Sequence, residues 1–404
     1  MHLNQMIPLP LRALRDLFVQ EGFDLRLVGG CVRDYLNNEP PHDVDLCTDA
    51  FPDEQLALYQ KHGIKYVETG LQHGTLTVVL EDESYEITSL RTEDEHDGRY
   101  AKMTYTRDWV EDLSRRDLTI NAMSLDFDGN LLDPFGGQAD LENRIVRFVG
   151  DAEGRMTEDY LRILRYFRFL GRMHPVQPHP EKLKSILPEQ EIRNCVHGLR
   201  GISVERIWTE TSKILEHFSG YWIYPLMMEM GLSEHTALPN GDSASMEWFK
   251  KLHDSMARHM LGNQAAVLLA PFMRDEAHVE QTAKALKWRS AERDVVKHIV
   301  SYDYAVTATE ILYQYFVMGR KLELVFAAAV YFDVDYAVNL LKRGLDGKFQ
   351  LATFPVSGDD LKALGVKPGP DLGAALKRLR EYWFYNDCNV SREALLQYMQ
   401  NQTM

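Results

Sequence analysis

The pattern of apolar and polar positions divides the chain into two parts. Up to about residue 150, short runs of aliphatic and β-branched residues are separated by Gly, Pro and Asp clusters. These runs predict strands at residues 25–28, 44–48, 75–80 and 85–90, and residues 53–62 predict a helix between two of them. A short sheet with a helix in sequence between its strands is typical of a modest α/β or α+β domain.

Helical periodicity replaces the strand pattern after Gly150. The apolar positions that recur three or four apart include Tyr160, Leu161, Leu164, Phe167 and Leu170. Ser203, followed by VERIWTETSKIL, predicts a capped helix. The rest is mostly amphipathic helix, broken at Gly, Pro and Asn clusters. We therefore predict an α+β fold, with a small mixed-sheet head followed by an all-α remainder.

Composition narrows the class of protein. The chain has 404 residues, of which 26% are charged and 45% hydrophobic, so disorder, collagen and coiled coil do not describe it as a whole. The net charge of −15, from 60 acidic and 45 basic residues, argues against a surface coated with positive charge. A local basic groove remains compatible with that sum.

Cysteines and apolar runs bear on the compartment. The four cysteines are scattered without a CxxC pair, which argues against a disulfide framework or a zinc site. The longest apolar run, residues 324–332, is too short to span a membrane, and the first residues do not resemble a signal peptide. We expect reduced thiols, no membrane association and a cytoplasmic location.

A glycine turn is the first sign of chemistry. Gly29 and Gly30 follow the predicted strand at 25–28 and lead into a short helix that carries Arg33. Glycines at such a turn let backbone N–H groups approach a phosphate, and the start of the helix adds positive potential. Arg33 would add a fixed positive charge. A lone glycine pair is more often only a turn.

Paired carboxylates follow the turn. Asp43 and Asp45 are two apart, so in a strand they would project from one face. Adjacent carboxylates repel unless a divalent cation neutralises them, and Mg²⁺ commonly uses one or two carboxylates plus substrate phosphates. Glu86, on a later strand, is a candidate third acid, with an exposed strand glutamate as the competing interpretation. Together these features indicate a metal–nucleotide site for phosphoryl-type transfer.

The same residues resemble a known family. LVGGCVRDYLNNEPPHDVDLCT (27–48) resembles the signature of the class II nucleotidyltransferases of the DNA polymerase β-like superfamily. This class includes the bacterial-type CCA-adding tRNA nucleotidyltransferases and the related poly(A) polymerases. Matching segments follow in order for ribose selection (112–126), a hinge (133–150), base recognition (158–169), a supporting helix (202–215) and a tRNA-binding tail (356–373).

The resemblance implies a division into domains. It implies a catalytic head at 1–150, a helical neck for base recognition at 151–215, a helical body at 216–350 and a helical, tRNA-binding tail at 351–404. Arg116 can bind phosphate or support the site, and Asp117 can accept a hydrogen bond from a ribose 2′-hydroxyl. A simple ion pair at a helix start is the alternative for these two residues.

Charged residues spaced three apart follow in the neck. They are Asp159, Arg162, Arg165 and Arg168, which we expect on one face of a helix that starts at Glu158. An Asp acceptor beside an Arg donor matches the Watson–Crick edges of cytosine and adenine, and the resemblance implies this role for Asp159 and Arg162. Arg165 and Arg168 would face nucleotide or RNA phosphate, while an exposed basic helix face is the alternative.

Supporting residues are expected around that helix. Glu158, Glu205, Arg206 and Glu210 are interpreted as bracing the recognition helix rather than as catalysts. His253-Asp254 is interpreted as a surface pair on a helix and not as part of a phosphohydrolase site.

The resulting hypothesis is template-independent addition of CCA to the 3′ end of tRNA. Asp43 and Asp45 would hold two Mg²⁺ ions, the substrates would be CTP and ATP, and no protein partner is inferred. The segment 97–101 reads DGRYA instead of DGRRP, which leaves open addition of the terminal A alone. A poly(A) polymerase and a catalytically idle tRNA-binding protein also remain open, while a Rossmann dehydrogenase is disfavoured because GxGxxG is absent.

Overall fold

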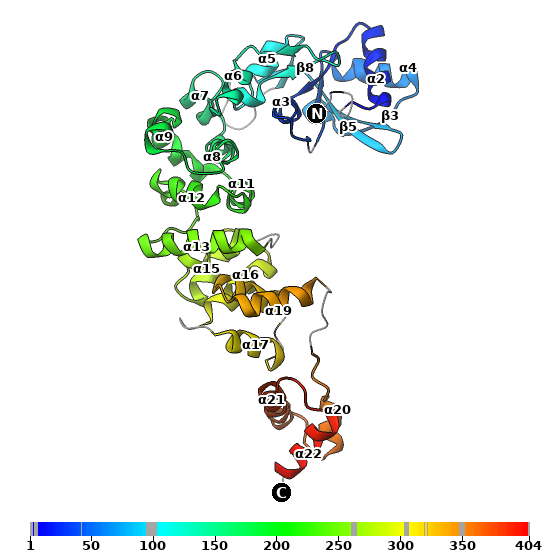
Figure 1. Ribbon diagram of the computed structural model, residues 1–404. Coiled ribbons are helices and arrows are strands. Elements are labelled where there is room, and N and C mark those ends of the chain that lie inside the picture. Colours follow the sequence, from blue (N-terminus) through cyan, green and yellow to red (C-terminus); the bar gives the residue numbers. More distant parts are fainter. Residues whose placement is uncertain are drawn as a thin grey trace. The chain divides into compact units, whose positions relative to one another are not determined.

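The computed structural model describes residues 3, 7–41, 43–93, 103–259, 265–302, 307–318, 320, 322–346 and 352–402. The chain divides into two compact units. The first contains residues 1–210 and 226–236, and the second contains residues 211–225 and 237–404. Figure 1 shows the helices and strands of both.

A mixed sheet forms the centre of the first unit. Its seven strands are β1 (Leu25–Val28), β2 (Leu46–Thr48), β3 (Lys65–Gly70), β4 (Thr75–Leu80), β5 (Glu83–Ser89), β8 (Ser124–Leu125) and β9 (Leu131–Leu132). Their order is β3-β4-β5-β2-β1-β8-β9, and β2 pairs with β5 in parallel while the other neighbours are antiparallel. A separate two-stranded sheet joins β6 (Arg91–Glu93) to β7 (Met103–Tyr105).

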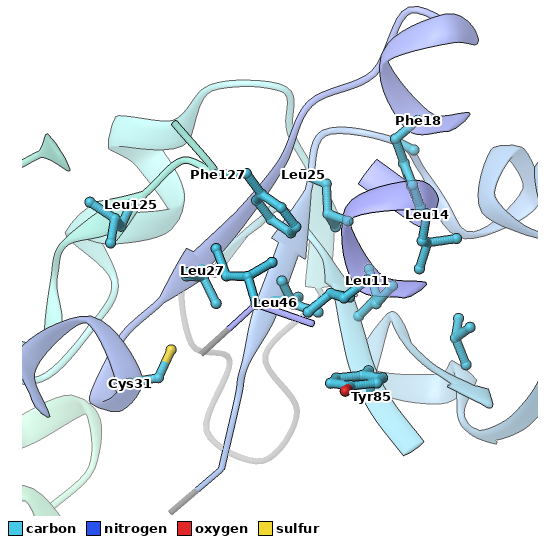
Figure 2. Packing of buried hydrophobic residues seen from close by; sticks show 14 of the residues in the cluster. Leu11, Leu14, Phe18, Leu25, Leu27, Cys31, Leu46, Tyr85, Leu125 and Phe127 are labelled. Carbon is cyan, nitrogen blue, oxygen red and sulfur yellow. The ribbon is translucent and has the colours of Figure 1, made fainter. Parts of the chain in front are cut away.

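One face of the sheet is covered by helices. Apolar residues of α2 (Leu9–Gln20) and α4 (Pro52–His62) pack on strand side chains such as Leu27, Leu46 and Ile87 to form the core (Figure 2). Because strand side chains alternate between faces, Cys47 and Thr88 point to the opposite face. That second face has only a small apolar cluster and is left for polar side chains.

Helices make up the rest of the first unit. They are α3 (Gly30–Leu36), α5 (Trp109–Ser114), α6 (Gly137–Glu142), α7 (Ala152–Glu158), α8 (Leu161–Met173), α9 (Pro180–Ile186) and α10 (Glu189–Cys195). Two further helices, α11 (Val204–Glu216) and α12 (Gly220–Glu229), run through the residues at which the two units divide.

The described elements of the second unit are helical. They are α13 (Ser243–His259), α14 (Ala265–Leu268), α15 (Glu276–Ala285), α16 (Ser290–Val300), α17 (Ala308–Phe316), α18 (Leu322–Tyr331), α19 (Asp335–Leu345), α20 (Gly358–Ala363), α21 (Pro370–Tyr385) and α22 (Arg392–Gln402). The last three helices gather their own apolar cluster around Leu379 and Trp383. Across the described residues, no helix combines the length and apolar character that crossing a bilayer requires.

The α+β fold class predicted from the pattern is confirmed. The strands at 25–28 and 75–80 have the predicted bounds, whereas the predicted strand 44–48 begins only at Leu46. The assignment of His253 to the surface is wrong, because this side chain is buried and its Nε2 lies 3.0 Å from the carbonyl oxygen of His217. His253 therefore caps the end of α11.

Candidate active site

Two of the predicted acids lie side by side on the open face of the sheet. The parallel register pairs Leu46 with Ile87, so Asp45 and Glu86, one residue earlier on each chain segment, are neighbours. The Asp45 carbonyl accepts a hydrogen bond from the N–H of Val28 at 3.0 Å, which fixes its backbone. The expectation that Asp43 and Asp45 belong to the strand is wrong, since both precede it.

A cavity of about 250 Å³ lies over these residues. Asp45 and Glu86 line it together with Cys47, Arg91 and Arg116. Acids and arginines on one wall suit a metal-bound or polyanionic ligand, because each charge on the ligand finds an opposite charge nearby.

The pKa of Asp45 reflects its burial and the charged side chains around it. Loss of hydration raises the pKa of the Asp45 carboxyl above its ordinary value, Arg116 lowers it, and the charges of Asp43 and Glu86 raise it. The three acids thus interact electrostatically. Even so, the described part of the chain holds no group of three His, Cys, Asp or Glu side chains placed to bind a metal ion together.

Gly29 brings the turn close to an arginine. Its φ of +70° lies in the left-handed region, and its N–H donates to the Met123 carbonyl at 3.1 Å. A Cβ at this position would lie 2.7 Å from Arg116 Nη1. Only glycine therefore lets the Arg116 guanidinium lie against the turn. Gly30 follows as the first residue of α3.

Asp112 orients the arginines of this wall. The buried Asp112 carboxylate accepts hydrogen bonds from Arg115 at 2.9 and 2.7 Å, from Arg116 at 3.4 Å and from the backbone N–H of Arg91 at 3.2 Å. The buried Nε of Arg116 has no hydrogen-bond partner among the described residues. Asp112 thus holds Arg116 in position on the cavity wall.

Arg33 serves a buried network. Its side chain is buried, and its guanidinium donates to Asp34 at 2.9 and 2.6 Å and to Asn121 Oδ1 at 2.6 Å. Asn121 in turn donates to Asp117 Oδ1 at 3.2 Å. The structure therefore places Arg33 beneath the turn, where it positions Asn121 and Asp117, and its direct contact with a phosphate stays a prediction.

Asp117 connects the segment after α5 to helix α8. Its Oδ2 accepts a hydrogen bond from Arg165 Nε of α8 at 2.6 Å. Burial acts to raise the pKa of Asp117, but Arg165, Asn121 and the backbone N–H of Leu118 outweigh it and hold the pKa below its ordinary value. Asp117 is thus ionised and keeps its role as a hydrogen-bond acceptor.

Two helices, not one, carry the base-recognition residues. α7 ends at Glu158 and α8 begins at Leu161, with Asp159 between them in an extended conformation. The Asp159 carboxylate accepts from the N–H of Leu161 at 3.1 Å, in the manner of a helix cap. The expectation of a single helix from Glu158 is therefore wrong, because Asp159 interrupts it.

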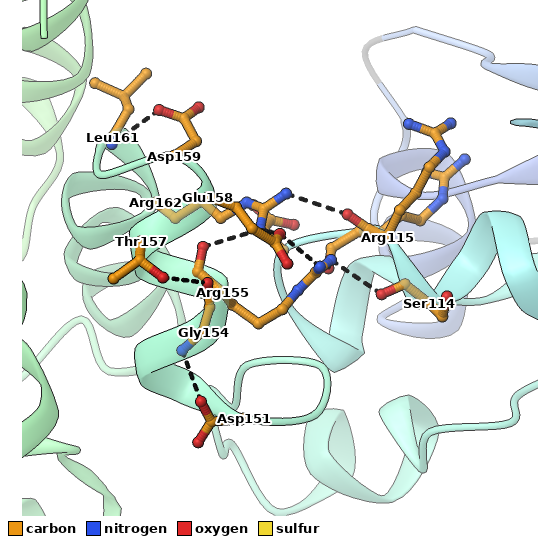
Figure 3. A network of polar contacts seen from close by, with 12 residues as sticks. Ser114, Arg115, Asp151, Gly154, Arg155, Thr157, Glu158, Asp159, Leu161 and Arg162 are labelled. Carbon is orange, nitrogen blue, oxygen red and sulfur yellow. Dashed lines mark hydrogen bonds and ion pairs between the residues drawn. The ribbon is translucent and has the colours of Figure 1, made fainter. Parts of the chain in front are cut away.

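Arg155 and Arg162 hold the backbone of residues 114–116, as Figure 3 shows. Arg155 donates to two carbonyl oxygens of this segment at 2.9 and 2.7 Å, and Arg162 donates to a third at 3.2 Å. Glu158 forms ion pairs with both arginines. Because Arg162 is buried in these contacts, the neck fixes the segment that leads into Arg116 and Asp117.

Two residues of α11 contact the segment that carries the predicted base-recognition residues. Arg206 donates to Asp159 Oδ2 at 2.8 Å, and Glu210 accepts from Arg168 Nε at 2.6 Å. Glu205 lies exposed in the first turn of the same helix. The Arg168 guanidinium also lies 4.4 Å from the centroid of the Phe169 ring.

All of the predicted site residues lie in the first unit. Residues 97–101, whose sequence left open addition of the terminal A alone, lie outside the described residues. Sequence reasoning missed Asp112, Asn121, Arg155 and Phe169. The spacing of Asp112 to Arg115 and Arg116, three and four residues apart, is a signal that the sequence offers. Asn121 leaves no such signal toward Arg33, which is 88 residues away in sequence.

Comparisons with known proteins agree with this geometry. The family model described as "Poly A polymerase head domain" matches residues 25–147, and the one described as "Probable RNA and SrmB- binding site of polymerase A" matches residues 189–243. The fold and site thus define a nucleotidyltransferase with a poly(A)-polymerase-type head.

Relatives matched over nearly the full length narrow the class. The "CCA tRNA nucleotidyltransferase 1, mitochondrial" of Danio rerio is 38% identical, covering 96% of this chain and 89% of the relative. The "CCA-adding enzyme" of Streptococcus mutans is 31% identical and covers 94% of both. A crystal structure of the Bacillus stearothermophilus CCA-adding enzyme in complex with CTP has a TM-score of 0.70 at 26% identity, covering 100% and 98% of the two chains. The chain belongs to the CCA-adding tRNA nucleotidyltransferases.

Proposed function

We propose that this chain adds C, C and A to the 3′ end of tRNA, using CTP and ATP and releasing pyrophosphate. The observation that carries the proposal is the cavity over the sheet, where Asp45 and Glu86 face Arg116. Asp117 and Arg165 of α8 lie in the same unit and are hydrogen-bonded to each other at 2.6 Å. The names of the relatives and the CTP complex support the substrate class.

Mg²⁺ fits the donor set of this cavity. The charges of Asp43 and Glu86 raise the pKa of Asp45, and a bound cation would relieve this repulsion, so Asp43 and Asp45 are the residues that would hold it. When bound, Mg²⁺ would neutralise triphosphate charge and favour the ionised 3′-hydroxyl. Because the described residues supply no third ligand at the same point, substrate phosphates and water would complete the coordination.

The residues of this chain mainly position the reactants. Arg116, held by Asp112, would contact the triphosphate, and Gly29 keeps the backbone close to it. The 3′-hydroxyl attacks the α-phosphate, a phosphodiester bond forms, and pyrophosphate leaves in line. Asp117 would accept a hydrogen bond from the ribose 2′-hydroxyl and so favour ribonucleotides.

Base selection would require a change of partners. Asp159 Oδ2 is engaged by Arg206, and Arg162 is engaged by Glu158 and the backbone of residues 114–116. Reading a cytosine or adenine edge with Asp159 and Arg162 means exchanging these contacts for contacts with the base. Arg206 and Glu158 would then hold Asp159 and Arg162 in place during the interval between one nucleotide addition and the next.

The location of the protein stays a separate prediction. We expect it in the cytoplasm. The vertebrate relative carries a mitochondrial name, so tagging the protein and imaging it in its own cell is the direct test.

Product length tests the proposed function. A tRNA ending before CCA, after C or after CC is supplied with CTP, ATP or both, and products are resolved by gel. We expect one to three additions that stop at CCA. Terminal A only, or long ATP products on unrelated RNA, would instead indicate an A-adding enzyme or a poly(A) polymerase.

Charge removal tests the assigned acids. Asp45→Asn should reduce incorporation by about a thousandfold or more with an unchanged unfolding midpoint, because it removes a metal ligand without changing shape. Asp82→Asn, at an exposed acid in the turn between β4 and β5, is the matched control. Incorporation by Asp45→Asn at the level of the control would refute the assignment.

A further inference from the structure

A second cavity lies in the first unit, away from the paired acids. Its volume is about 310 Å³, and it shares no lining residue with the cavity over Asp45. It lies among α3, the turn that follows α6 and the end of α8. Its charged lining residues are Arg33, Glu39, Arg144 and Arg172. Asp34 neutralises Arg33 at 2.6 Å, so Arg144 and Arg172 are the two cations that face the single carboxylate of Glu39, and an anion is the favoured ligand.

Arg172 retains hydrogen-bonding capacity toward this cavity. Its Nη2 is 3.8 Å from Asp34 Oδ1 and 3.9 Å from Glu39 Oε2. Both distances exceed those of a hydrogen bond, so these carboxylates attract Arg172 without using its N–H groups. The pairing of Arg33 with Asp34 at 2.6 Å is much closer. Arg172 is thus held near the wall with donors available for a ligand.

Arg144 occupies a backbone position that favours glycine. It follows Asn143, the cap of α6, with a φ of +55°. A residue other than glycine in this region costs on the order of 1 kcal/mol. His174 Nε2 lies 2.8 Å from the Arg144 carbonyl oxygen and ties the turn to the end of α8. An arginine at this position suggests that its side chain is needed for something other than the turn.

The Arg144 side chain has no competing partner in the described structure. It is exposed, and its guanidinium forms no hydrogen bond or ion pair with the described residues. A nearby arginine differs, because Arg147 pairs with Asp140 at 2.8 Å. Arg144 is therefore a free planar donor beside Arg172 on the wall of one cavity.

We propose that this second cavity binds a phosphodiester group of the tRNA backbone through Arg144 and Arg172. Planar guanidinium forks match the non-bridging oxygens of a phosphate, and such contacts position nucleic acid without reading its sequence. The proposal rests on the proposed function, because tRNA is taken as the ligand. Nucleotide triphosphates and pyrophosphate share this chemistry, and the test separates them from RNA.

The decisive variant is Arg144→Gly. It removes the cation and also relieves the backbone, so the protein should be as stable as the wild type or more stable. Affinity for tRNA, measured by fluorescence anisotropy in 0.1 M salt, should fall roughly fivefold to tenfold, as expected for one lost phosphate contact. The slope of log Kd against log salt should decrease in magnitude by about one. Arg172→Gln should have a similar effect.

Arg147→Gln serves as the matched control, because it removes the same charge from a nearby exposed arginine. Loss of tRNA affinity in Arg144→Gly no greater than in this control would overturn the proposal. A raised KM for CTP with unchanged tRNA affinity would also overturn it, since the cavity would then bind nucleotide phosphates. If the wild-type protein adds no nucleotide but Arg144→Gly still weakens tRNA binding, the proposed function fails and the phosphate site stands.

Discussion

Gly29 satisfies two requirements at a single residue. Its φ of +70° is unfavourable for other residues, and a Cβ would come within 2.7 Å of Arg116 Nη1. The first requirement concerns folding and the second concerns the placement of an arginine in the cavity wall. Substituting Gly29 and a second glycine with a similar φ can therefore separate the effect on folding from the effect on Arg116.

Gly29→Ala should lower both stability and activity. Gly63, which ends α4, has a φ of +66° but open space around it, so Gly63→Ala introduces the backbone cost without the contact. We expect each variant to lose about 1 kcal/mol of unfolding free energy, and only Gly29→Ala to lose tenfold or more in kcat/KM for CTP. Urea denaturation and incorporation assays measure the two effects. Equal activity in both variants would show that Arg116 tolerates the displacement.

At the residue scale, the sequence supports a hypothesis where the candidate residues lie close together along the chain. Asp43, Asp45 and Gly29 belong to one short segment, so their order alone indicated a phosphate and metal site. Asn121 could not be found from the order of residues in the sequence, because the fold brings it together with Arg33 and Asp117. The site-residue roles themselves stay predictions until the variants are measured.

At the scale of elements, the pair Asp117–Arg165 connects the head to α8. The carboxylate is buried, while the guanidinium is partly exposed. Because the pKa of Asp117 is held below its ordinary value, folding favours its ionised form. This stabilisation is present above the unfolded-state pKa and is lost as the pH falls through the lower, folded-state pKa.

Arg165→Gln should therefore destabilise the protein in a pH-dependent way. At pH 7 we expect a loss of about 1–3 kcal/mol in unfolding free energy, because a buried carboxylate loses its partner. The difference from the wild type should stay constant down to about pH 4 and shrink below it. Urea titrations from pH 7 to pH 3 measure it. Arg193→Gln, which removes an exposed pair with Glu189, is the control and should change stability by less than about 1 kcal/mol. A pH-independent difference would contradict the coupling.

The bounds of an element were predicted best where its buried residues follow a single periodic pattern. The strands at 25–28 and 75–80 alternate in burial or nearly so, and their bounds were found. The boundary between α7 and α8 was missed, because the residues on both sides keep helical spacing and only the Asp159 carboxylate interrupts them. At this point the hydrogen bond from the N–H of Leu161 to the Asp159 carboxylate ends one helix and starts the next, although the helical spacing of the sequence continues.

At the scale of the whole molecule, negative charge dominates, with a net −15. The arginines of α8 are partly neutralised by Asp117 and Glu210, so few cations remain for RNA. Lys377 and Arg378 of α21 are exposed and add to them. We therefore expect that each unit, taken by itself, offers only a narrow basic track on an acidic surface.

Salt dependence of tRNA binding should report the width of this track. Between 50 and 200 mM salt, affinity should fall by about tenfold to a hundredfold, as for roughly two to four phosphate contacts. Anisotropy titrations at four salt concentrations give the slope. A fall of a thousandfold or more would indicate a broad basic surface and contradict the expectation.

The short strand β2 has a consequence for motion at the site. It is only Leu46–Thr48, yet it lies inside the sheet with β1 on one side and β5 on the other. Its amide hydrogens are therefore shielded on both edges and exchange with water only when neighbouring strands separate. Asp45 is attached directly to this slowly exchanging segment. The acid that would hold the metal is thus attached to a strand that is hydrogen-bonded on both sides, and we expect rearrangement during a nucleotide cycle to involve the side chains and segments around it.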